Sequence, residues 1–204
     1  MPHRTHRIRA EYGALAARYE KRWQRYLSVT HERTLRALGP LASGARVLDA
    51  GCGTGQMLRT LHARRPDLAL IGLDASPLML EQTGDADVAR LQGELTHLPL
   101  TSATVNAVLC SSALHYVDDP ALALAEMRRV LSGDGWLVLT DWRAEHAVTA
   151  LRCMRLRFLR RPLGHVLRTG EALELMRRAG FSPERVERYS VRGWGLFTVL
   201  AAAA

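Results

Sequence analysis

Apolar and polar residues follow a regular succession of helical and extended periods along the chain. From residue 10 to residue 38, apolar and aromatic side chains recur at steps of three and four, which predicts one amphipathic helix that Gly39–Pro40 ends. Short apolar runs with the length of buried strands come next. They span residues 45–50, 68–74, 88–94, 104–112 and 135–142.

Helical segments separate these runs. One spans residues 56–65, another opens at Ser76–Pro77 with Ser76 as its cap, and a third runs from Asp119–Pro120 to about Leu131. Because a strand that alternates with a helix builds a βαβ unit, the pattern predicts an α/β fold with a parallel sheet and right-handed crossovers.

The pattern loosens after residue 143. An arginine-rich helical segment extends to about residue 161, and a helix follows over residues 171–179. Two strands are expected near residues 185–191 and over residues 196–201. A strand, a tight turn and a second strand predict an antiparallel finish to the sheet.

The composition is that of a globular protein. Of 204 residues, 48% are apolar and 24% are charged, which excludes a disordered or fibrous chain and suits a single domain. The apolar run over residues 196–204 is too short for a membrane span of about 20 residues, and we expect no signal peptide. Three cysteines, Cys52, Cys110 and Cys153, lack metal-ligand spacing and predict a reduced cytoplasmic protein without a metal centre.

The net charge of +8 is unevenly distributed. Residues 1–46 carry 10 basic and 3 acidic groups (+7), residues 47–142 carry 6 and 12 (−6), and residues 143–204 carry 12 and 5 (+7). A basic balance is typical of proteins that bind nucleic acids or anionic surfaces. Here the basic excess belongs to the two flanks, whereas the centre of the chain is acidic.

The sharpest motif is VLDAGCGTG, in which a strand ends at Asp49 and glycines occupy positions 51, 53 and 55 before a helix. Glycines allow a tight turn, and the following helix offers free N–H groups, as in nucleotide-binding loops. Gln56 stands where the dinucleotide fingerprint has glycine or alanine, and Asp49 would repel a pyrophosphate. The loop therefore predicts a ligand with a cationic end.

Two further acids lie at the ends of predicted strands. Asp74 ends the strand over residues 68–74, 19 residues beyond Gly55, where a carboxylate can accept both hydroxyls of a ribose. Glu94 comes at the end of the next strand and can meet the edge of an adenine. Three acids at the carboxyl ends of strands in an open α/β sheet predict one nucleoside-binding site.

In this order the motifs resemble those of the class I S-adenosylmethionine-dependent methyltransferases of the small-molecule branch. The resemblance runs from about Tyr12 to Ala201 and rests on VLDAGCGTG, LIGLDASPLML, LQGELTHLPL and LHYVDDPALALAEMRRVLSGDGWLVLTDW. It implies a Rossmann-like three-layer α/β sandwich, with a seven-stranded, mostly parallel sheet whose last strand is antiparallel. The N-terminal helix would be a lid, and S-adenosyl-L-methionine would become S-adenosyl-L-homocysteine.

The resemblance also implies the residues that bind the methyl donor. The glycine loop would lie under the methionine part with Asp49 toward its ammonium group, Asp74 would bind the ribose, and Glu94 would bind the adenine amine. The full expected set is Tyr12, Tyr19, Asp49, Gly51, Cys52, Gly53, Gly55, Asp74, Ala75, Ser76, Met79, Gly93, Glu94, Leu95 and Ser111.

The acceptor pocket is expected at the same edge of the sheet, lined by His115, Tyr116, Trp142 and Arg143. Methyl transfer from a sulfonium needs positioning and exclusion of water, and it needs a base only where the acceptor loses a proton. His115 is the candidate catalytic base, although a structural histidine that caps the loop is the interpretation we favour.

Residues 143–168 should close the acceptor side. They interleave apolar residues such as Leu151 and Phe158 with arginines, and we favour an amphipathic cap helix with a solvated arginine face. The alternatives are recognition of an acceptor that bears a carboxylate or phosphate, and attachment to an anionic membrane that holds a lipophilic acceptor.

We therefore expect a single methyltransferase domain over residues 1–204 that acts on a small organic acceptor. It divides into a helical lid (1–40), a donor-binding core (45–142), an acceptor-side cap (143–168), and a C-terminal helix and strand pair (169–204). Two alternatives remain open: an RNA methyltransferase that uses the basic flanks, and a catalytically silent S-adenosylmethionine-binding or scaffold protein.

Overall fold

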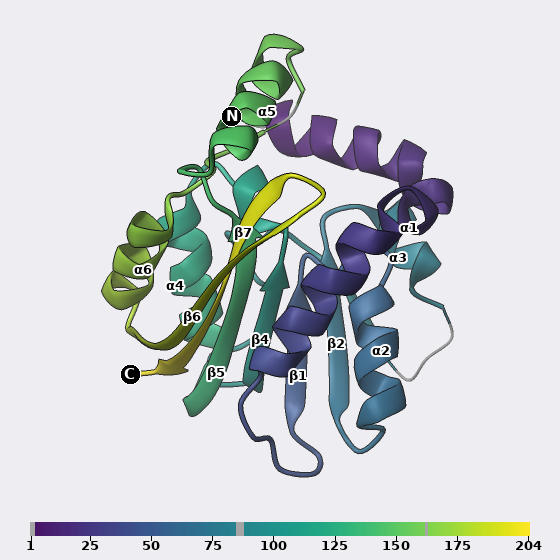
Figure 1. Cartoon of the computed structure of the whole chain (residues 1–204). Coiled ribbons are helices and arrows are strands. Elements are labelled where there is room, and N and C mark those ends of the chain that lie inside the picture. The colour runs from purple at the N-terminus through teal and green to yellow at the C-terminus, as the bar shows by residue number, and fades with distance from the viewer. Residues whose placement is uncertain (1–2, 85–87, 162) are drawn as a thin grey trace.

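The computed structural model describes residues 3–84, 88–161 and 163–204 (Figure 1). A seven-stranded sheet with strand order β3-β2-β1-β4-β5-β7-β6 forms its centre. Strand β7 runs antiparallel to both of its neighbours, and the other pairings are parallel. The expected seven-stranded, mostly parallel sheet with an antiparallel last strand is thus confirmed. The strands are β1 (Arg46–Ala50), β2 (Ala69–Asp74), β3 (Val88–Gln92), β4 (Val105–Ser111), β5 (Leu131–Trp142), β6 (Phe181–Val191) and β7 (Trp194–Ala203).

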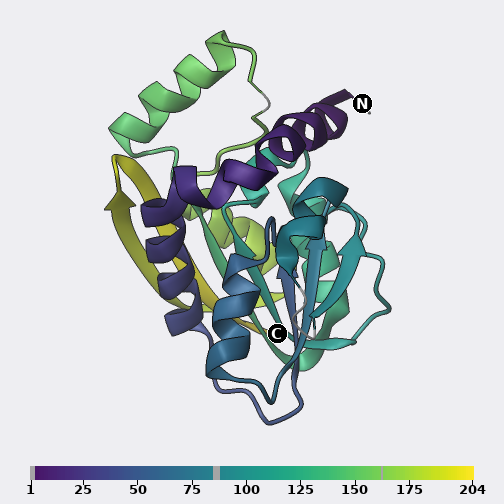
Figure 2. The same ribbon diagram turned by 90° about the vertical axis from the view of Figure 1, so that its right-hand side faces the viewer.

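Helices cover both faces of the sheet (Figures 1 and 2). Alternate residues of the central strands point into two separate cores: Val47 and Leu109 pack under α2, whereas Leu48 and Val108 pack under α4 and α6. The helices are α1 (His3–Ala37), α2 (Gln56–Arg64), α3 (Pro77–Leu80), α4 (Pro120–Val130), α5 (Ala147–Phe158) and α6 (Thr169–Arg178), with 3₁₀ turns η1 (Glu81–Thr83) and η2 (Leu114–Tyr116).

The chain reverses its direction of travel across the sheet between β1 and β4. It builds β1, β2 and β3 outward on one side, then returns to place β4 against the other side of β1. In open α/β sheets, ligands bind at the carboxyl ends of the strands at such a switch point. The loop after β1 and the end of β4 therefore mark where a ligand site is expected.

Helix α1 changes direction along its length. Its first half crosses above the carboxyl ends of the strands, and its second half runs down along the sheet (Figures 1 and 2). Tyr26 and Leu27, from the middle of α1, join a third apolar cluster with Trp142 at the end of β5 and Trp194 at the start of β7. This cluster fixes α1 over the switch point.

The ends of several elements differ from the sequence prediction. Strand β3 ends at Gln92, because Glu94 leaves the ladder and forms an isolated bridge with His97. Strand β5 starts at Leu131, four residues earlier than expected, because Leu131 pairs with Val105 beside an irregularity in the ladder. Strand β6 starts at Phe181 rather than near residue 185, since pairing with β7 continues across a second irregularity.

Helices begin at both places where the sequence predicted a start, Ser76–Pro77 and Asp119–Pro120. Asp119 caps α4, because its carboxylate accepts a hydrogen bond of 3.0 Å from the N–H of Leu122. Ser76 occupies the N-cap position of α3, as predicted, but its side chain makes no capping bond, and its own N–H donates to Asp74 Oδ1 at 2.8 Å. Pro77 does occupy the first turn of α3.

Candidate active site

Three adjoining cavities lie at the carboxyl ends of the strands. The inner pocket, about 100 Å³, lies over the glycine loop and is lined by residues from α1, the loop, the end of β2 and the end of β4. The edge pocket, about 350 Å³, lies between the end of β2 and the segments after β3 and β4. The outer pocket, about 450 Å³, lies between α1, α5 and the ends of β5 and β7.

The glycine loop is held by backbone hydrogen bonds. The N–H groups of Gly51 and Cys52 both donate to the carbonyl of Leu73 on β2, at 2.8 and 2.9 Å. Gly51 has a φ of 86°, and a Cβ placed there would lie 2.4 Å from the Cβ of Ala113. Only glycine therefore fits at this position, where the loop passes against the segment that follows β4.

Asp74 ties the glycine loop to β2. One oxygen of its carboxylate accepts the N–H of Gly53 at 2.9 Å, and the other accepts the N–H of Ser76 at 2.8 Å. Each carboxylate oxygen can accept a further hydrogen bond, and Asp74 lines both the inner and the edge pocket. Its position suits a ligand that offers two hydroxyl groups.

Asp49 is buried beneath the loop, with 1% of its surface exposed. Neither carboxylate oxygen has a hydrogen-bond partner among the described residues. Burial, and then the charge of Asp74, raise the pKa of Asp49 from 3.8 to about 8. An uncompensated buried acid beside a nucleotide-type loop is a site that a cationic group would stabilise.

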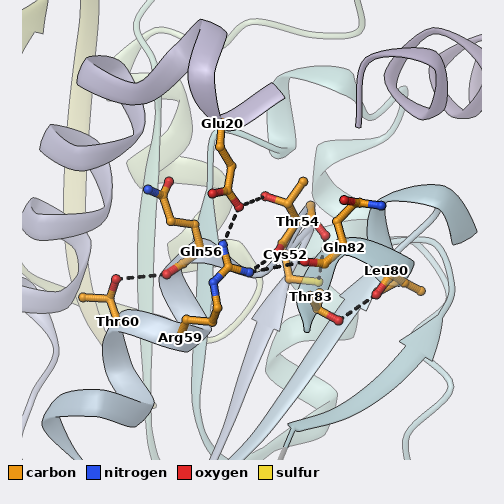
Figure 3. Close-up of polar contacts among 10 residues, drawn as sticks. Glu20, Cys52, Thr54, Gln56, Arg59, Thr60, Leu80, Gln82 and Thr83 are labelled. Carbon is orange, nitrogen blue, oxygen red and sulfur yellow. Dashed lines mark hydrogen bonds and ion pairs between the residues drawn. The ribbon is translucent and has the colours of Figure 1, made fainter. Parts of the chain in front are cut away.

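Glu20 connects helix α1 to the glycine loop and to α2 through a hydrogen bond and an ion pair (Figure 3). Glu20 accepts a hydrogen bond from the hydroxyl of Thr54 at 2.7 Å and pairs with the guanidinium of Arg59 on α2. Arg59 also donates to the carbonyl of Thr54 at 2.6 Å. These contacts hold α1 over the inner pocket.

Two of the polar residues that were not predicted from the sequence lie in the inner pocket without a partner in the described part of the chain. His31 Nδ1 on α1 and Gln56 Oε1 on α2 are buried without a hydrogen-bond partner among the described residues. Burial lowers the pKa of His31 from 6.5 to about 4, so the ring is neutral at pH 7. No local sequence signal marks His31, because it lies on α1 far from the motifs it faces.

The structure gathers most of the predicted donor-binding residues into two adjoining pockets. Asp49 and Gly55 are the exceptions: Asp49 lies beneath the loop, and Gly55 packs against Thr83 at the start of α2. Ten residues line the inner pocket, namely Tyr12, Tyr19, Gly51, Cys52, Gly53, Asp74, Ala75, Ser76, Met79 and Ser111. Gly93, Glu94 and Leu95 line the edge pocket.

The inner and outer pockets share one wall. Tyr12, Tyr19, Ser112 and Tyr116 line both. The hydroxyl groups of Tyr12 and Tyr116 are hydrogen-bonded across the gap between α1 and η2, and burial raises the pKa of Tyr12 to about 12. Ligands in the outer and inner pockets would therefore approach each other at this shared boundary of three tyrosines and one serine.

A column of stacked rings forms another side of the outer pocket. His115 stacks on Trp142 with ring centres 3.7 Å apart, and Trp142 stacks on Trp194 at 4.0 Å. The guanidinium of Arg152 lies over Trp194, 4.8 Å from the ring centre. The column presents a flat apolar surface with a cation at one end.

His115 is paired with a buried acid. Its Nδ1 lies 2.5 Å from Asp141 Oδ1 on β5, and its backbone N–H donates to the other oxygen at 3.0 Å. Only 2% of His115 is exposed, and Nε2 has no hydrogen-bond partner among the described residues. A proton on Nδ1, donated to Asp141, would leave Nε2 as a proton acceptor at the outer pocket.

Arginines dominate the polar lining of the outer pocket. Arg143, which was expected there, is not among the residues that line it. Arg161 is paired with Glu11 at 2.8 Å. The arginines that line the pocket are Arg22, Arg152, Arg155, Arg161 and Arg192.

Helix α5 has the expected solvated arginines, since Arg155 and Arg157 are exposed, but it exposes several apolar side chains as well. Phe158 is 85% exposed and Met154 is 62% exposed, whereas Arg152 and Arg155 line the outer pocket. Of the described residues, no helix is long and apolar enough to cross a membrane, and no group of histidine, cysteine or acidic side chains could hold a metal ion.

Comparison with known proteins finds that part of this chain is similar to methyltransferases. The model of a methyltransferase domain family matches residues 48–139. A malonyl-[acyl-carrier protein] O-methyltransferase of Laribacter hongkongensis is 33% identical over 145 residues, which are 65% of this chain and 49% of the relative. A ubiquinone/menaquinone biosynthesis C-methyltransferase of Citrifermentans bemidjiense is 30% identical over 157 residues, 67% of this chain and 63% of the relative.

The chain thus spans about half to two thirds of the length of these curated relatives. A solved structure of an S-adenosylmethionine-dependent methyltransferase from Thermotoga maritima matches with a TM-score of 0.78 and 22% identity. That match covers 98% of this chain and 99% of the other, so the whole fold is shared.

Proposed function

The chain carries a methyltransferase domain of the class I S-adenosylmethionine-dependent family, and we propose that it transfers a methyl group from S-adenosyl-L-methionine to a small anionic acceptor. The observation that carries the proposal is the aromatic wall of Tyr12, Tyr19, Ser112 and Tyr116 shared by the inner and outer pockets. Transfer by in-line displacement requires the two reactants to meet across a short, dry junction.

The residues of the inner and edge pockets fit the donor. Bound S-adenosylmethionine supplies an activated methyl group on a cationic sulfur. The buried, unpartnered carboxylate of Asp49 suits the positive methionine end, and the carboxylate of Asp74 suits the ribose hydroxyls. Glu94 and the backbone of Leu95 line the edge pocket, where an adenine would lie.

The outer pocket suits an acceptor with a flat or apolar body and an anionic group. Stacked Trp142 and Trp194 offer the apolar surface, and arginines such as Arg22 and Arg192 offer charge and hydrogen bonds to a carboxylate or phosphate. The two curated relatives are named for a malonyl-[acyl-carrier protein] and for ubiquinone/menaquinone biosynthesis, which supports an acceptor of this kind.

We assign His115 the role of general base, held by Asp141. A hydroxyl of the acceptor would give its proton to Nε2, and its oxygen would form the new bond to the methyl carbon. The electron pair of the broken carbon–sulfur bond stays on the sulfur of the donor product, S-adenosyl-L-homocysteine. Asp141 then stabilises the protonated ring, as an orienting carboxylate does in other histidine bases.

The three free cysteines, Cys52, Cys110 and Cys153, support the proposal of a reducing, cytoplasmic location. Two of them are buried and the third is half-buried.

The direct test supplies isotope-labelled S-adenosylmethionine with two cell fractions, total RNA and small organic acids, and identifies labelled products by mass. We expect label in a small acidic compound that is retained by an anion exchanger. Label in RNA would contradict the proposed acceptor class, and the absence of transfer to any fraction, with donor binding intact, would favour a silent binding protein.

A further inference from the structure

Helix α5 carries an apolar face that is open to solvent. Four of its exposed apolar side chains recur at steps of three and four, which places them on one side of the helix, and a fifth belongs to the C-cap residue that follows. Figures 1 and 2 show α5 standing out from the body of the molecule, beyond the ends of β5 and β7. The exposed residues of this α5 face are Val148 (42%), Leu151 (60%), Met154 (62%), Phe158 (85%) and Leu159 (52%).

This concentration is unusual within the molecule. The described residues include eight exposed large hydrophobic side chains, and five of them belong to the α5 face. A contiguous exposed apolar patch marks an interaction surface, whereas single exposed apolar residues do not. The question is therefore which partner accepts this face.

The charge around the α5 face indicates which kind of partner it binds. From Ala147 to Arg168 the chain has six arginines and no aspartate or glutamate. Arg155, Arg157 and Arg160 are exposed, so guanidinium groups border the apolar stripe. The surface combines apolar side chains with positive charge alone.

We propose that the α5 face docks on an anionic lipid surface. Leu151, Met154 and Phe158 would enter the boundary between headgroups and acyl chains, and the flanking arginines would contact lipid phosphates. This is the arrangement of an interfacial amphipathic helix, in which basic residues near the surface are attracted to anionic lipids.

The position of α5 gives the docking a consequence for the acceptor. Arg152, Arg155 and Leu156 from this helix line the outer pocket, and Leu159 belongs both to that lining and to the α5 face. The helix that meets the lipid is thus also a wall of the outer pocket. An amphiphilic anion could pass from the bilayer to the aromatic column without crossing open water.

The test is flotation of the full chain with vesicles of phosphatidylcholine alone and of phosphatidylcholine mixed equally with phosphatidylglycerol. We expect binding to the anionic vesicles to exceed binding to the neutral vesicles about tenfold or more, and to fall steeply between low and high salt. Met154→Ser combined with Phe158→Ser should reduce binding to anionic vesicles about tenfold or more, because two apolar anchors are lost.

Neither Met154 nor Phe158 lines the outer pocket or the inner pocket, so the double variant should keep its melting temperature and its affinity for S-adenosylmethionine. Val186→Ser is the matched control, since Val186 is 40% exposed on β6, and it should bind vesicles as the parent does. Equal binding to both vesicle types, or an unchanged double variant, would overturn the proposal. So would dimerisation through the α5 face or capture of a soluble acidic protein with no vesicle binding.

Discussion

Two aspartates at neighbouring strand ends show how surroundings decide what the same side chain does. Asp74 accepts two backbone N–H groups and organises the loop, whereas Asp49 has no partner and its pKa rises to about 8. In the unfolded chain an aspartate titrates near 3.8. Between about pH 4 and pH 8 the folded protein therefore holds a proton on Asp49 that the unfolded chain has lost.

It follows that the donor-free protein loses stability as the pH rises through this window. Asp49→Asn should remove that loss, because an amide has no proton to give up. Thermal melting from pH 5 to pH 9 should show a melting temperature that falls for the parent and stays more nearly constant for the variant. Asp67→Asn is the control, because its exposed partner Arg65 lowers the pKa of Asp67 to about 2, outside the range. Parallel curves for the parent and Asp49→Asn would disprove the assignment.

The pairing of His115 with Asp141 predicts how substitutions at the two residues change kcat. Positioned acid–base groups contribute about 10² to 10⁴ in rate, so His115→Asn should lower kcat by about that factor while donor affinity is kept. Asp141→Asn should lower kcat as well, since the histidine would lose the acceptor that fixes its tautomer.

A purely structural histidine would behave differently. If His115 is the base, added imidazole should restore part of the rate of His115→Asn. A variant with the parent kcat would show that His115 only packs against Trp142.

At the scale of elements, the contact between α1 and the glycine loop depends on Glu20, Thr54 and Arg59 (Figure 3). Glu20→Gln should speed donor release several-fold, because α1 would be held less firmly over the inner pocket. The melting temperature should change little, since the pair is more than a third exposed and such pairs contribute about 0–1 kcal/mol.

A second ion pair between α1 and α2 provides a matched control. Glu32 pairs with Arg64 of α2 at 2.6 Å, with both side chains about half exposed. Unlike Glu20 and Arg59, this pair is not bonded to Thr54 of the glycine loop. Glu32→Gln should leave the release rate, measured by stopped-flow fluorescence, unchanged. Equal effects of the two substitutions would show that Glu20 contributes only general helix packing.

The periodicity of the sequence was sufficient for the order and type of the elements, because the buried strands and amphipathic helices are locally marked. It was insufficient for the start of β5 and β6, where pairing with a distant strand extends each element across a ladder irregularity. The glycine loop and Asp74 were found because their spacing is local. Asp141 and Trp194 were missed because their roles arise from contacts with His115 and Trp142 across the fold.

At the scale of the whole molecule, the basic excess surrounds the outer pocket rather than the inner one. The inner pocket contains Asp74 and lies above Asp49, whereas five arginines and one glutamate line the outer pocket. The acids would thus favour a cationic donor in the inner pocket, and the arginines would favour an anionic acceptor in the outer pocket. Electrostatic complementarity of this kind governs specificity and the rate of association.

Arg22 provides the corresponding test. Arg22→Ala should raise KM for an acidic acceptor about tenfold, which corresponds to about 1.4 kcal/mol, and leave donor affinity unchanged. Arg25→Ala is the control, because Arg25 is also exposed on α1 but does not line the outer pocket. A KM that responds equally to both substitutions would reduce the role of the arginines to a general attraction.

Isothermal titration calorimetry can decide whether the inner and edge pockets bind S-adenosylmethionine through the acids at the ends of β1 and β2. The parent protein should bind S-adenosyl-L-homocysteine at one site, and Asp74→Asn, in which one charged acceptor is lost, should bind at least about tenfold more weakly with its circular dichroism unchanged. Undiminished affinity of a folded Asp74→Asn protein, or no binding by the parent, would contradict the account.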